Sequence, residues 1–517
     1  MDPIAELDRF NPDPALREWV LGLVDQTKQD AQTIAAKESA IKAADLKIQS
    51  LTLELACYKR IRFANKSEQF SPDQRELFQE SWNTDTSAIA AEVEDLADKR
   101  SGKKSRSRAG RQPLPDHLPR IEHRHEPESC QCGECGNALV KIGEDVSEQL
   151  DVEPARFFVH RHIRPQYACR QCETVKAEPV PPAIIDGGMA APGLLTWVMI
   201  SKFADHLPLY RLEQIAARQN VVLSRSTLAD WVGRVGFALQ PLVDRLTELL
   251  LKRAVLHADE TPVAQLDPGV GKTKKAYLWS YRSNDLDEGA PIVVFDYQPG
   301  RSGSHARNFL QDWTGRLMVD DYAGYKALFG KGIVELACWA HARRKFFDLH
   351  AANQSPIAAE ALKRIAKLYA VEQDGKDMSA DERQRLRTEW AVPLLKDMHS
   401  WLIATRKTVA EGSGTARAID YSLKRWAALI RYADSGHLPI DNNPVENSIR
   451  PIAVGKKNWL FAGSERAGRR AAAIQTLLGT AKLNGLDPHA WLKDTLEKLP
   501  AWPNSRIDEL LPLPNNA

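Results

Sequence analysis

The sequence predicts a multidomain α/β protein whose main domain contains a mixed sheet flanked by helices. Its 517 residues suffice for about three to four domains. Strand-like runs occupy residues 253–257, 276–281 and 292–297, and a helix–strand–helix–strand pattern then places further strands at 316–319 and 333–338. Three consecutive strands followed by crossover units are typical of a mixed sheet in which the later strands lie parallel to the first.

Helices flank and interrupt this strand pattern. The sequence predicts a helix at 304–313 and a basic helix at 341–350, whereas residues 351–437 contain no strand-like run. We therefore expect a core domain in two parts, at 251–350 and 439–480, an all-helical insertion at 351–438, and a C-terminal helical segment at 481–517.

The composition is that of an ordinary soluble protein. Hydrophobic residues make up 43% of the chain, charged residues make up 27%, and the net charge is +2. No run of 18 apolar residues exists, and the first six residues lack the basic region and apolar core of a secretion signal. We expect a cytoplasmic protein without a membrane partner.

Apolar residues repeat every seven positions near the N-terminus, so residues 1–70 are expected to form a helical leucine-zipper region. Lys37 interrupts the pattern at one position, and charged residues and Gln fill the other faces. The repeat predicts a coiled coil that brings two protomers together, and the alternative is one amphipathic helix packed on its own chain. The repeating residues are Ile34, Ile41, Ile48 and Leu55, with Ala44, Leu51 and Tyr58 at the companion positions.

A basic segment follows, and residues 71–120 are expected to form a flexible linker. Residues 98–124 contain nine Lys or Arg against three acidic residues, with Gly, Ser and Pro throughout. Such a linker is suited to lie along DNA phosphates, and the alternative is a solvated tether.

Two Cys-x-x-Cys pairs predict a zinc-ribbon domain at residues 121–185. Cys132 and Cys135 form the first pair, Cys169 and Cys172 form the second, and 33 residues lie between the two pairs. Four cysteines with this spacing suit a closed, structural Zn²⁺ site. Cys130 is an alternative to Cys132 as a ligand, and buried cysteines without metal are the alternative to zinc binding.

Residues 186–250 have a helical pattern that includes a possible helix-turn-helix. Helices are expected at 209–218 and from Arg225 to residue 232, joined by a short turn. This arrangement would place Arg225 near the start of the second helix, where DNA-reading side chains lie. An ordinary helical hairpin is the alternative.

Three acidic positions predict a metal site. Asp259 is expected to follow the first strand immediately, and Asp320 and Asp321 are expected to follow the fourth. Two parallel strands would bring Asp259 and Asp320 to one edge of the sheet, where carboxylates repel unless protonated or bridged by a cation such as Mg²⁺. Glu446, in a later helix, would supply a third carboxylate. The alternative for each Asp taken singly is a turn or capping role.

The helix that carries Glu446 has its own signals. Asn443 suits the N-cap, Pro444 suits the first position, and Pro451 is expected to end the helix after two turns. In the alternative interpretation Asn443 and Glu446 form a capping box.

Several long motifs resemble the signature segments of the bacterial insertion sequence 66 family of DDE transposases. The likeness extends to the N-terminal zipper, to Lys66-Ser67-Glu68 and to the cysteine pairs, so it covers nearly the whole chain. The motifs are His257-Ala-Asp-Glu-Thr-Pro262, Val319-Asp-Asp-Tyr-Ala-Gly-Tyr325, Cys338-Trp-Ala-His-Ala-Arg-Arg-Lys-Phe346, Asp441-Asn-Asn-Pro-Val-Glu-Asn-Ser-Ile-Arg450, Gly455-Lys-Lys-Asn-Trp-Leu-Phe-Ala-Gly-Ser464 and Ala481-Lys-Leu-Asn-Gly485.

This resemblance implies a ribonuclease H-like catalytic core. Asp259, Asp320 and Glu446 would be the catalytic residues and would hold two Mg²⁺ or Mn²⁺ ions, while Zn²⁺ would be structural. The family usually carries Gly at the position of Asp321, and we assign the metal-binding role to Asp320.

The resemblance also implies a function. The enzyme would cleave the transposon ends, free a 3′-hydroxyl and join it to target DNA, acting at the bacterial nucleoid and with accessory proteins of the same element. The residues expected to contact DNA are Arg450, Lys456, Lys457, His341, Arg344 and Arg225. One alternative is a DNA-binding regulator without catalysis, and a less favoured one is a zinc hydrolase that uses His257, Asp259 and His341.

Overall fold

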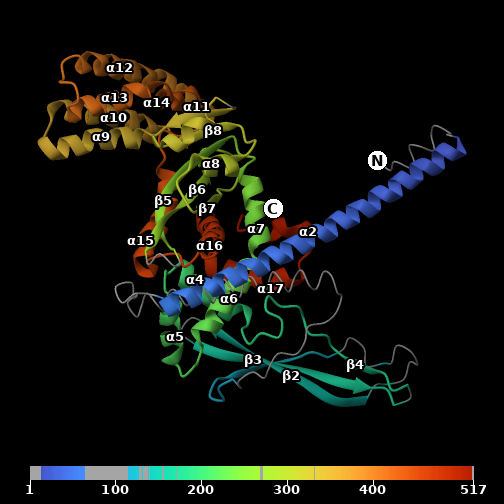
Figure 1. The fold of residues 1–517 in the computed structure, drawn as a ribbon. Helices are drawn as coiled ribbons and strands as arrows, with labels where there is room; N and C mark the ends of the chain where they lie inside the picture. The colour runs from blue at the N-terminus through green and yellow to red at the C-terminus, as the bar shows by residue number, and fades with distance from the viewer. Residues whose placement is uncertain are drawn as a thin grey trace.

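The computed structural model describes most of the chain. The described residues are 13–63, 114–126, 131, 138, 140–153, 156–170, 172–267, 272–330 and 332–514. Figure 1 shows an elongated arrangement in which a cluster of helices lies at one end, a central sheet with its helices lies in the middle, and a second sheet lies at the other end. The chain is thus a mixed α/β protein with several domains, as predicted.

The central sheet has five strands in the order β7-β6-β5-β8-β9. Strands β5, β6 and β7 pair antiparallel, and β5, β8 and β9 pair parallel. The predicted mixed sheet is therefore confirmed. The strands are β5 (Val255–Leu266), β6 (Thr273–Ser283), β7 (Val293–Gln298), β8 (Gly315–Val319) and β9 (Ile333–Ala337).

One predicted strand end is wrong. Strand β5 does not stop before Asp259 but continues to Leu266, so Asp259 lies within the strand. The physical reason is the pairing: β6 accompanies β5 from Leu256 to Leu266, whereas β8 pairs with β5 only as far as His257. Beyond His257, β5 therefore continues past the end of its parallel neighbour.

Helices cover both faces of this sheet. Helix α8 (Gly303–Leu310) and the short helix η2 (Ala323–Leu328) pack on one face, where Leu310 and Leu328 join the largest core. Helix α15 (Asn443–Trp459) packs on the other face, with Val445 and Ile449 against Val263 of β5.

Helix α16 (Glu465–Leu483) closes the open edge of β7. The Thr476 hydroxyl accepts a hydrogen bond from the backbone N–H of Phe295 (2.9 Å), and the Thr480 hydroxyl donates to the carbonyl of Val293 (3.0 Å). Because an unpaired strand edge can pair with another chain, these two threonines also protect the sheet from edge-to-edge association.

Two predictions about α15 are wrong. The helix does not end at Pro451 but continues to Trp459, because Ile449 and Ile452 on either side of the proline are buried against the sheet. Such packing offsets the backbone hydrogen bond that a proline removes from a helix. The N-cap is Asn442 rather than Asn443, and the Asn442 side chain does not cap the helix. Asp441 instead accepts a hydrogen bond from the backbone N–H of Asn443 (3.1 Å), so the capping-box interpretation also fails.

Residues 351–437, the segment predicted to be a helical insertion, form helices and no strand. Its core is built around Trp339, Phe346 and Ile365 and continues into Met318 of β8 and Leu336 of β9. The elements are α9 (Trp339–Asn353), α10 (Pro356–Asp374), α11 (Ala380–Leu386), η3 (Arg387–Ala391), α12 (Val392–Arg406), α13 (Gly414–Lys424), α14 (Trp426–Ile430) and η4 (Arg431–Asp434).

A helical layer lies below the central sheet in Figure 1 and shares the large apolar core that contains Leu310 and Leu328. In α6, Leu228, Trp231 and Val235 are buried, so the solvent-exposed residues of this helix lie mainly in its first turn. The layer consists of α4 (Pro192–Phe203), α5 (Leu209–Ala217), α6 (Arg225–Ala238), α7 (Gln240–Leu250), α17 (Pro488–Lys498), η5 (Leu499–Ala501) and η6 (Asn504–Leu510).

The second sheet has β3 at its centre. Strand β1 pairs parallel with β3, while β2 and β4 pair antiparallel with it. Leu150 and Val159 are buried and connect this sheet to the core of the helical layer. The strands are β1 (Arg120–Arg124), β2 (Val140–Glu153), β3 (Arg156–Ala168) and β4 (Val175–Ala177).

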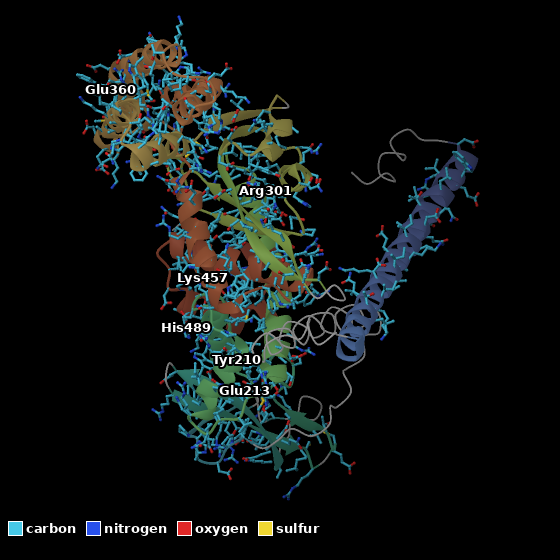
Figure 2. All side chains as sticks on the ribbon, turned by 60° about the vertical axis from the view of Figure 1, so that its left-hand side comes forward. Tyr210, Glu213, Arg301, Glu360, Lys457 and His489 are labelled. Carbon is cyan, nitrogen blue, oxygen red and sulfur yellow. The ribbon has the colours of Figure 1, made fainter. Side chains whose placement is uncertain are left out.

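The N-terminal helix α2 (Pro14–Phe63) is a rod of 50 residues, and Figure 2 shows most of it standing away from the rest of the chain. Ile34, Ile41 and Ile48 are 56%, 61% and 59% exposed, although their spacing is that of a coiled-coil seam. None of the helices that the structure describes is both long and apolar enough to cross a membrane.

Candidate active site

Asp259 and Asp320 lie level with each other where β8 ends. The parallel pairing aligns Val255 of β5 with Arg316 of β8, and His257 with Met318. Two residues further along, the same register sets Asp259 beside Asp320, the first residue after β8. Both carboxylates therefore belong to the carboxyl end of the parallel strands, the edge at which α/β sheets place their functional groups.

The buried side chain of Asn442 fixes the start of α15 against the sheet. Its amide donates to the carbonyl of Ala258 (2.9 Å) and accepts from Nδ1 of His257 (3.0 Å), both on β5. Its backbone N–H donates to Sγ of Cys338 at the end of β9 (3.2 Å). Because Glu446 follows one turn later, these contacts set the position of its carboxylate relative to Asp259.

The three carboxylates interact electrostatically. Burial of Asp259, followed by the charges of Glu260, Asp320 and Glu446, raises its pKa to about 8. A hydrogen bond from the backbone N–H of Glu260 to Asp259 opposes this increase (2.9 Å). The surroundings therefore favour a neutral Asp259 unless a cation offsets the negative charge, which is the environment that a divalent metal ion requires.

Asp320 and Asp321 have different surroundings. One oxygen of Asp320 accepts from the backbone N–H of Tyr322 (2.8 Å), and its charge acts on Asp259. Asp321 instead forms ion pairs with Lys326 (3.4 Å) and Arg425 (3.7 Å). Its charge is thus offset by two cations, whereas Asp320 faces the other acids.

Glu260 is adjacent to Asp259 but lies on the opposite face of β5. Its fully buried carboxylate accepts two hydrogen bonds from Arg301 (2.5 and 2.8 Å) and one from the hydroxyl of Tyr325 (2.9 Å). Burial raises the pKa of Glu260, and Arg301 opposes the change. With both oxygens engaged, Glu260 supports the strand beneath Asp259 rather than binding a ligand.

His341 and Cys338 lie next to Glu446. The Nδ1 atom of His341 is 3.6 Å from Oε1 of Glu446. One ligand atom from each of Cys338, His341 and Glu446 can be chosen so that all three lie within 4.8 Å of one another. The predicted DNA contact His341 is therefore part of the acidic site, whereas Arg344, on the same helix, is exposed.

The helical insertion supports the site through two side chains. Arg425 donates to the carbonyl of Asp320 (3.0 Å) and to Glu335 of β9 (2.5 Å). The hydroxyl of Tyr369 donates to Asp441, next to Asn442 (2.9 Å). The insertion therefore holds both the loop after β8 and the residues that start α15.

Several of these supporting residues were missed by reasoning from the sequence. Asn442 was within reach, because it lies in the same motif as Glu446 and an Asn before a helix is a common signal. Arg425 and Tyr369 carry no local signal, since they lie in the insertion and reach the site only through the tertiary fold.

The predicted DNA-binding residues lie on several elements. Arg450 and Lys457 of α15 are exposed, and Lys456 donates to the carbonyl of Pro262 (3.0 Å). Arg225, at the start of α6, pairs with Glu213 of α5 (3.0 Å). In Figure 2, Lys457 lies in the middle of the elongated body, and Glu213 lies toward the end with the second sheet.

The second cysteine pair forms a tight turn in the second sheet. Cys169 is buried, and its backbone N–H donates to the carbonyl of Thr174 (3.0 Å), while its own carbonyl accepts from Glu173 (3.0 Å). Cys172 lies in the same turn and contacts the Thr174 hydroxyl (3.2 Å). Such a turn presents two thiols to one metal ion and fits the predicted zinc site. Cys132 and Cys135, like the greater part of the basic linker, lie outside the described residues.

Comparison with protein families gives consistent results along the chain. The family described as "Transposase IS66 family" matches residues 187–470. Three smaller elements also match, and they are the zinc-finger binding domain of transposase IS66 (129–173), the IS66 C-terminal element (476–513) and the zipper element described as "Transposase C of IS166 homeodomain" (50–122).

Related proteins occur in Sinorhizobium fredii. The uncharacterized protein y4jD is 37% identical over 480 residues, which cover 89% of this chain and 94% of the relative. The uncharacterized protein y4qI is 36% identical over 536 residues, covering 99% and 98%. The chain belongs to the IS66 family of transposases and carries the family's zinc-finger, leucine-zipper and C-terminal elements.

Proposed function

We propose that this protein is a DDE transposase that cleaves DNA at transposon ends and joins the freed 3′-hydroxyl to target DNA. The observation that supports this most strongly is that Asp259 is buried within electrostatic reach of Asp320 and Glu446: burial, followed by the charges of Glu260, Asp320 and Glu446, raises the pKa of Asp259 to about 8. Three acids from separate parts of the chain meet at one sheet edge, where a cation is needed to keep them all ionised.

The architecture supports a ribonuclease H-like core. Three antiparallel strands are followed by two that lie parallel to the first, in the order β7-β6-β5-β8-β9. In this proposal Asp259 comes from the first strand of the core, Asp320 from the end of the fourth and Glu446 from the helix after the insertion.

Each acid has a separate role in the proposed reaction. Asp259 and Asp320 would hold the metal ions between them, and Glu446 would complete the second binding position. When bound, two Mg²⁺ or Mn²⁺ ions activate the attacking oxygen and stabilise the leaving oxygen of the phosphodiester. Asn442 and Arg425 orient the acids without contacting DNA, through the hydrogen bonds described above.

Basic residues around the site would bind the DNA backbone. We assign phosphate contacts to Arg450, Lys456 and Lys457 on α15 and to Arg344 on α9, and a further contact to Arg225. The zinc ribbon and the basic linker would recognise the terminal repeats, and the exposed seam of α2 would join two protomers. Accessory proteins of the same element are expected partners, and the bacterial nucleoid is the expected site of action.

Two other functions make different predictions. A DNA-binding regulator would keep the ribbon and the zipper but would not need coupled carboxylates. A zinc hydrolase that uses His257, Asp259 and His341 is disfavoured because His257 is fully buried and donates to Asn442.

Cleavage of end-labelled transposon-end DNA separates these functions. We expect the wild-type protein to nick the end with Mg²⁺ or Mn²⁺ and the Asp259→Ala variant to bind the same DNA without nicking it. Binding without cleavage by the wild-type protein under all metal conditions would favour the regulator. Cleavage by Asp259→Ala at the wild-type rate would overturn the proposed site.

A further inference from the structure

Two polar atoms beside the acidic site are buried. Neither Nδ1 of His341 nor Oε1 of Glu446 has a hydrogen-bond partner among the residues that the structure describes, although the two atoms are only 3.6 Å apart. Leaving a buried polar atom unsatisfied costs about 1–3 kcal/mol. The thiol of Cys338 completes a set of three ligand atoms within 4.8 Å of one another. We propose that Cys338, His341 and Glu446 form a binding site for Zn²⁺ or a similar thiophilic divalent cation.

The distance between His341 and Glu446 fits one small cation. A Zn–N bond of about 2.0–2.1 Å and a Zn–O bond of about 2.0–2.2 Å, at a tetrahedral angle, place the two ligand atoms roughly 3.4 Å apart. The observed 3.6 Å between Nδ1 of His341 and Oε1 of Glu446 is close to this value. The separation is too long for a hydrogen bond and suits two ligands of a common ion.

Cys338 and His341 both lie at the start of helix α9. Cys338 is the N-cap of α9, and His341 follows three residues later, so both side chains lie at the positive end of the helix dipole. Burial raises the pKa of the Cys338 thiol to about 12, and the backbone N–H of Asn442, which donates to Sγ (3.2 Å), opposes this increase. Binding would release the thiol proton and form a metal–sulfur bond, with no change in oxidation state.

The chemical types of the three ligand atoms determine which metal ion this site prefers. A thiolate and an imidazole favour Zn²⁺ over Mg²⁺, which prefers oxygen ligands. Three protein ligands leave a fourth position of a tetrahedral ion for water or another small ligand. Asp259 and Asp320 offer only carboxylate oxygens, so the two neighbouring sites differ in the ions that they prefer.

Glu446 would belong to both sites. A Zn²⁺ ion held by Cys338 and His341 would draw the carboxylate of Glu446 away from Asp259 and Asp320 and would therefore inhibit Mg²⁺-dependent cleavage. This inhibition rests on the function proposed above, whereas the binding of Zn²⁺ does not.

Cobalt titration of the full-length protein tests the binding directly. Co²⁺ bound by thiolates gives sulfur-to-metal charge-transfer absorption, and the zinc ribbon contributes equally in every variant. We expect the wild-type protein to bind one more equivalent of Co²⁺ than Cys338→Ser and to show the absorption of one more thiolate. His341→Gln and Glu446→Gln should weaken that extra equivalent at least about tenfold.

Matched variants control for indirect effects. Cys57→Ser removes a cysteine outside both ribbon pairs, and His350→Gln removes a histidine from the same helix α9, so both should keep the extra equivalent. His341 is partly exposed (24%), so its variant should fold even if Cys338→Ser does not. Equal cobalt binding by the wild-type, Cys338→Ser and His341→Gln proteins would overturn the site.

A cleavage assay tests the inhibition separately. At fixed Mg²⁺, added Zn²⁺ should slow cleavage by the wild-type protein more than cleavage by Cys338→Ser, each compared with its own rate without Zn²⁺. Equal inhibition of both proteins would overturn the regulatory role while leaving the binding result intact. Absence of cleavage by the wild-type protein in Mg²⁺ would instead contradict the proposed function.

Discussion

At the scale of single residues, the site combines acids that differ in how their charge is offset. Asp321 is paired with Lys326 and Arg425, and Glu260 is bonded to Arg301. Asp259, by contrast, has three acids acting on it and accepts a hydrogen bond from one backbone N–H. The negative charge that is not paired with Lys or Arg in this comparison is therefore that of Asp259, on the face of β5 that packs against α15.

The neighbouring aspartates allow a matched comparison. Asp320→Asn should reduce Mg²⁺-dependent cleavage by at least about a hundredfold, because it removes a metal ligand from the site. Asp321→Asn should change the rate by less than about threefold, since its charge is already offset by two cations. Single-turnover cleavage of labelled transposon-end DNA measures both, and a larger loss in the Asp321 variant would reverse the assignment.

Asn442 should matter for both stability and catalysis. Asn442→Ala removes the hydrogen bonds to His257 and Ala258 and should lower the free energy of unfolding by about 2–3 kcal/mol. The rate of DNA cleavage should fall as well, because these hydrogen bonds no longer hold the start of α15, and with it Glu446, in place against β5. Denaturant unfolding and the cleavage assay check this, with Asn447→Ala, an exposed position on α15, as the control. Unchanged stability and cleavage in Asn442→Ala would show that Asn442 does not hold the helix.

At the scale of elements, long helices are used in two ways. Helix α15 is held to the sheet by Val445, Ile449 and Ile452 and therefore tolerates Pro451 in its interior. In helix α2, by contrast, the described isoleucines Ile34, Ile41 and Ile48 are more than half exposed. An exposed apolar seam of this kind is expected to pair with a second copy.

The zipper seam can be tested with one substitution. Ile41→Lys should weaken self-association at least about tenfold, because burial of an isoleucine contributes about 1.5–3 kcal/mol at such an interface. Sedimentation analysis of the full-length protein measures the association. Ala35→Lys, placed off the seam, should leave it unchanged, and equal effects of both variants would argue against the predicted register.

The second sheet carries a ladder of histidines. Nε2 of His123 is 2.8 Å from Nδ1 of His160, and Nε2 of His125 is 3.1 Å from Nδ1 of His162. Burial, followed by the charges of His123, His125, Arg164 and His160, lowers the pKa of His162 to about 4. A folded-state pKa below the ordinary value of 6.5 means that the unfolded chain binds the proton first as the pH falls.

The stability of this sheet should therefore be complete above about pH 6.5 and decrease as the pH falls toward 4. With solvent screening of the partly exposed ring taken into account, the contribution of His162 is roughly 1 kcal/mol. Hydrogen exchange of β3 amides at pH 7.5 and pH 5 measures it. His162→Gln should show a smaller pH dependence than the wild type, and an identical dependence would rule out His162 as the cause.

At the scale of the whole molecule, the insertion and the core form one support for the site. Arg425 and Tyr369 come from the insertion, yet they hold the backbone of Asp320 and the side chain of Asp441. A shared apolar cluster packs β8 and β9 against the insertion. The insertion thus helps to set the geometry of the acids on which the proposed chemistry depends.

The sequence predicted this arrangement unevenly, for physical reasons. Alternation of apolar residues and turn signals located the five strands and the insertion, and the parallel pairing of β5 with β8 brings Asp259 level with Asp320. The end of β5 was missed because a strand ends where its pairing ends, and only the tertiary fold specifies that Leu266 still pairs with β6. The helix end at Pro451 failed in the same way, since packing outweighed local propensity.

The proposed function depends on Asp259, Asp320 and Glu446 holding divalent ions jointly. A crystal structure of the protein soaked in Mn²⁺, with anomalous scattering recorded at the manganese edge, tests it most directly. We predict two anomalous peaks about 4 Å apart among the three carboxylates, both lost in Asp259→Ala. Absence of peaks among these carboxylates, or peaks between them that persist in Asp259→Ala, would contradict this assignment.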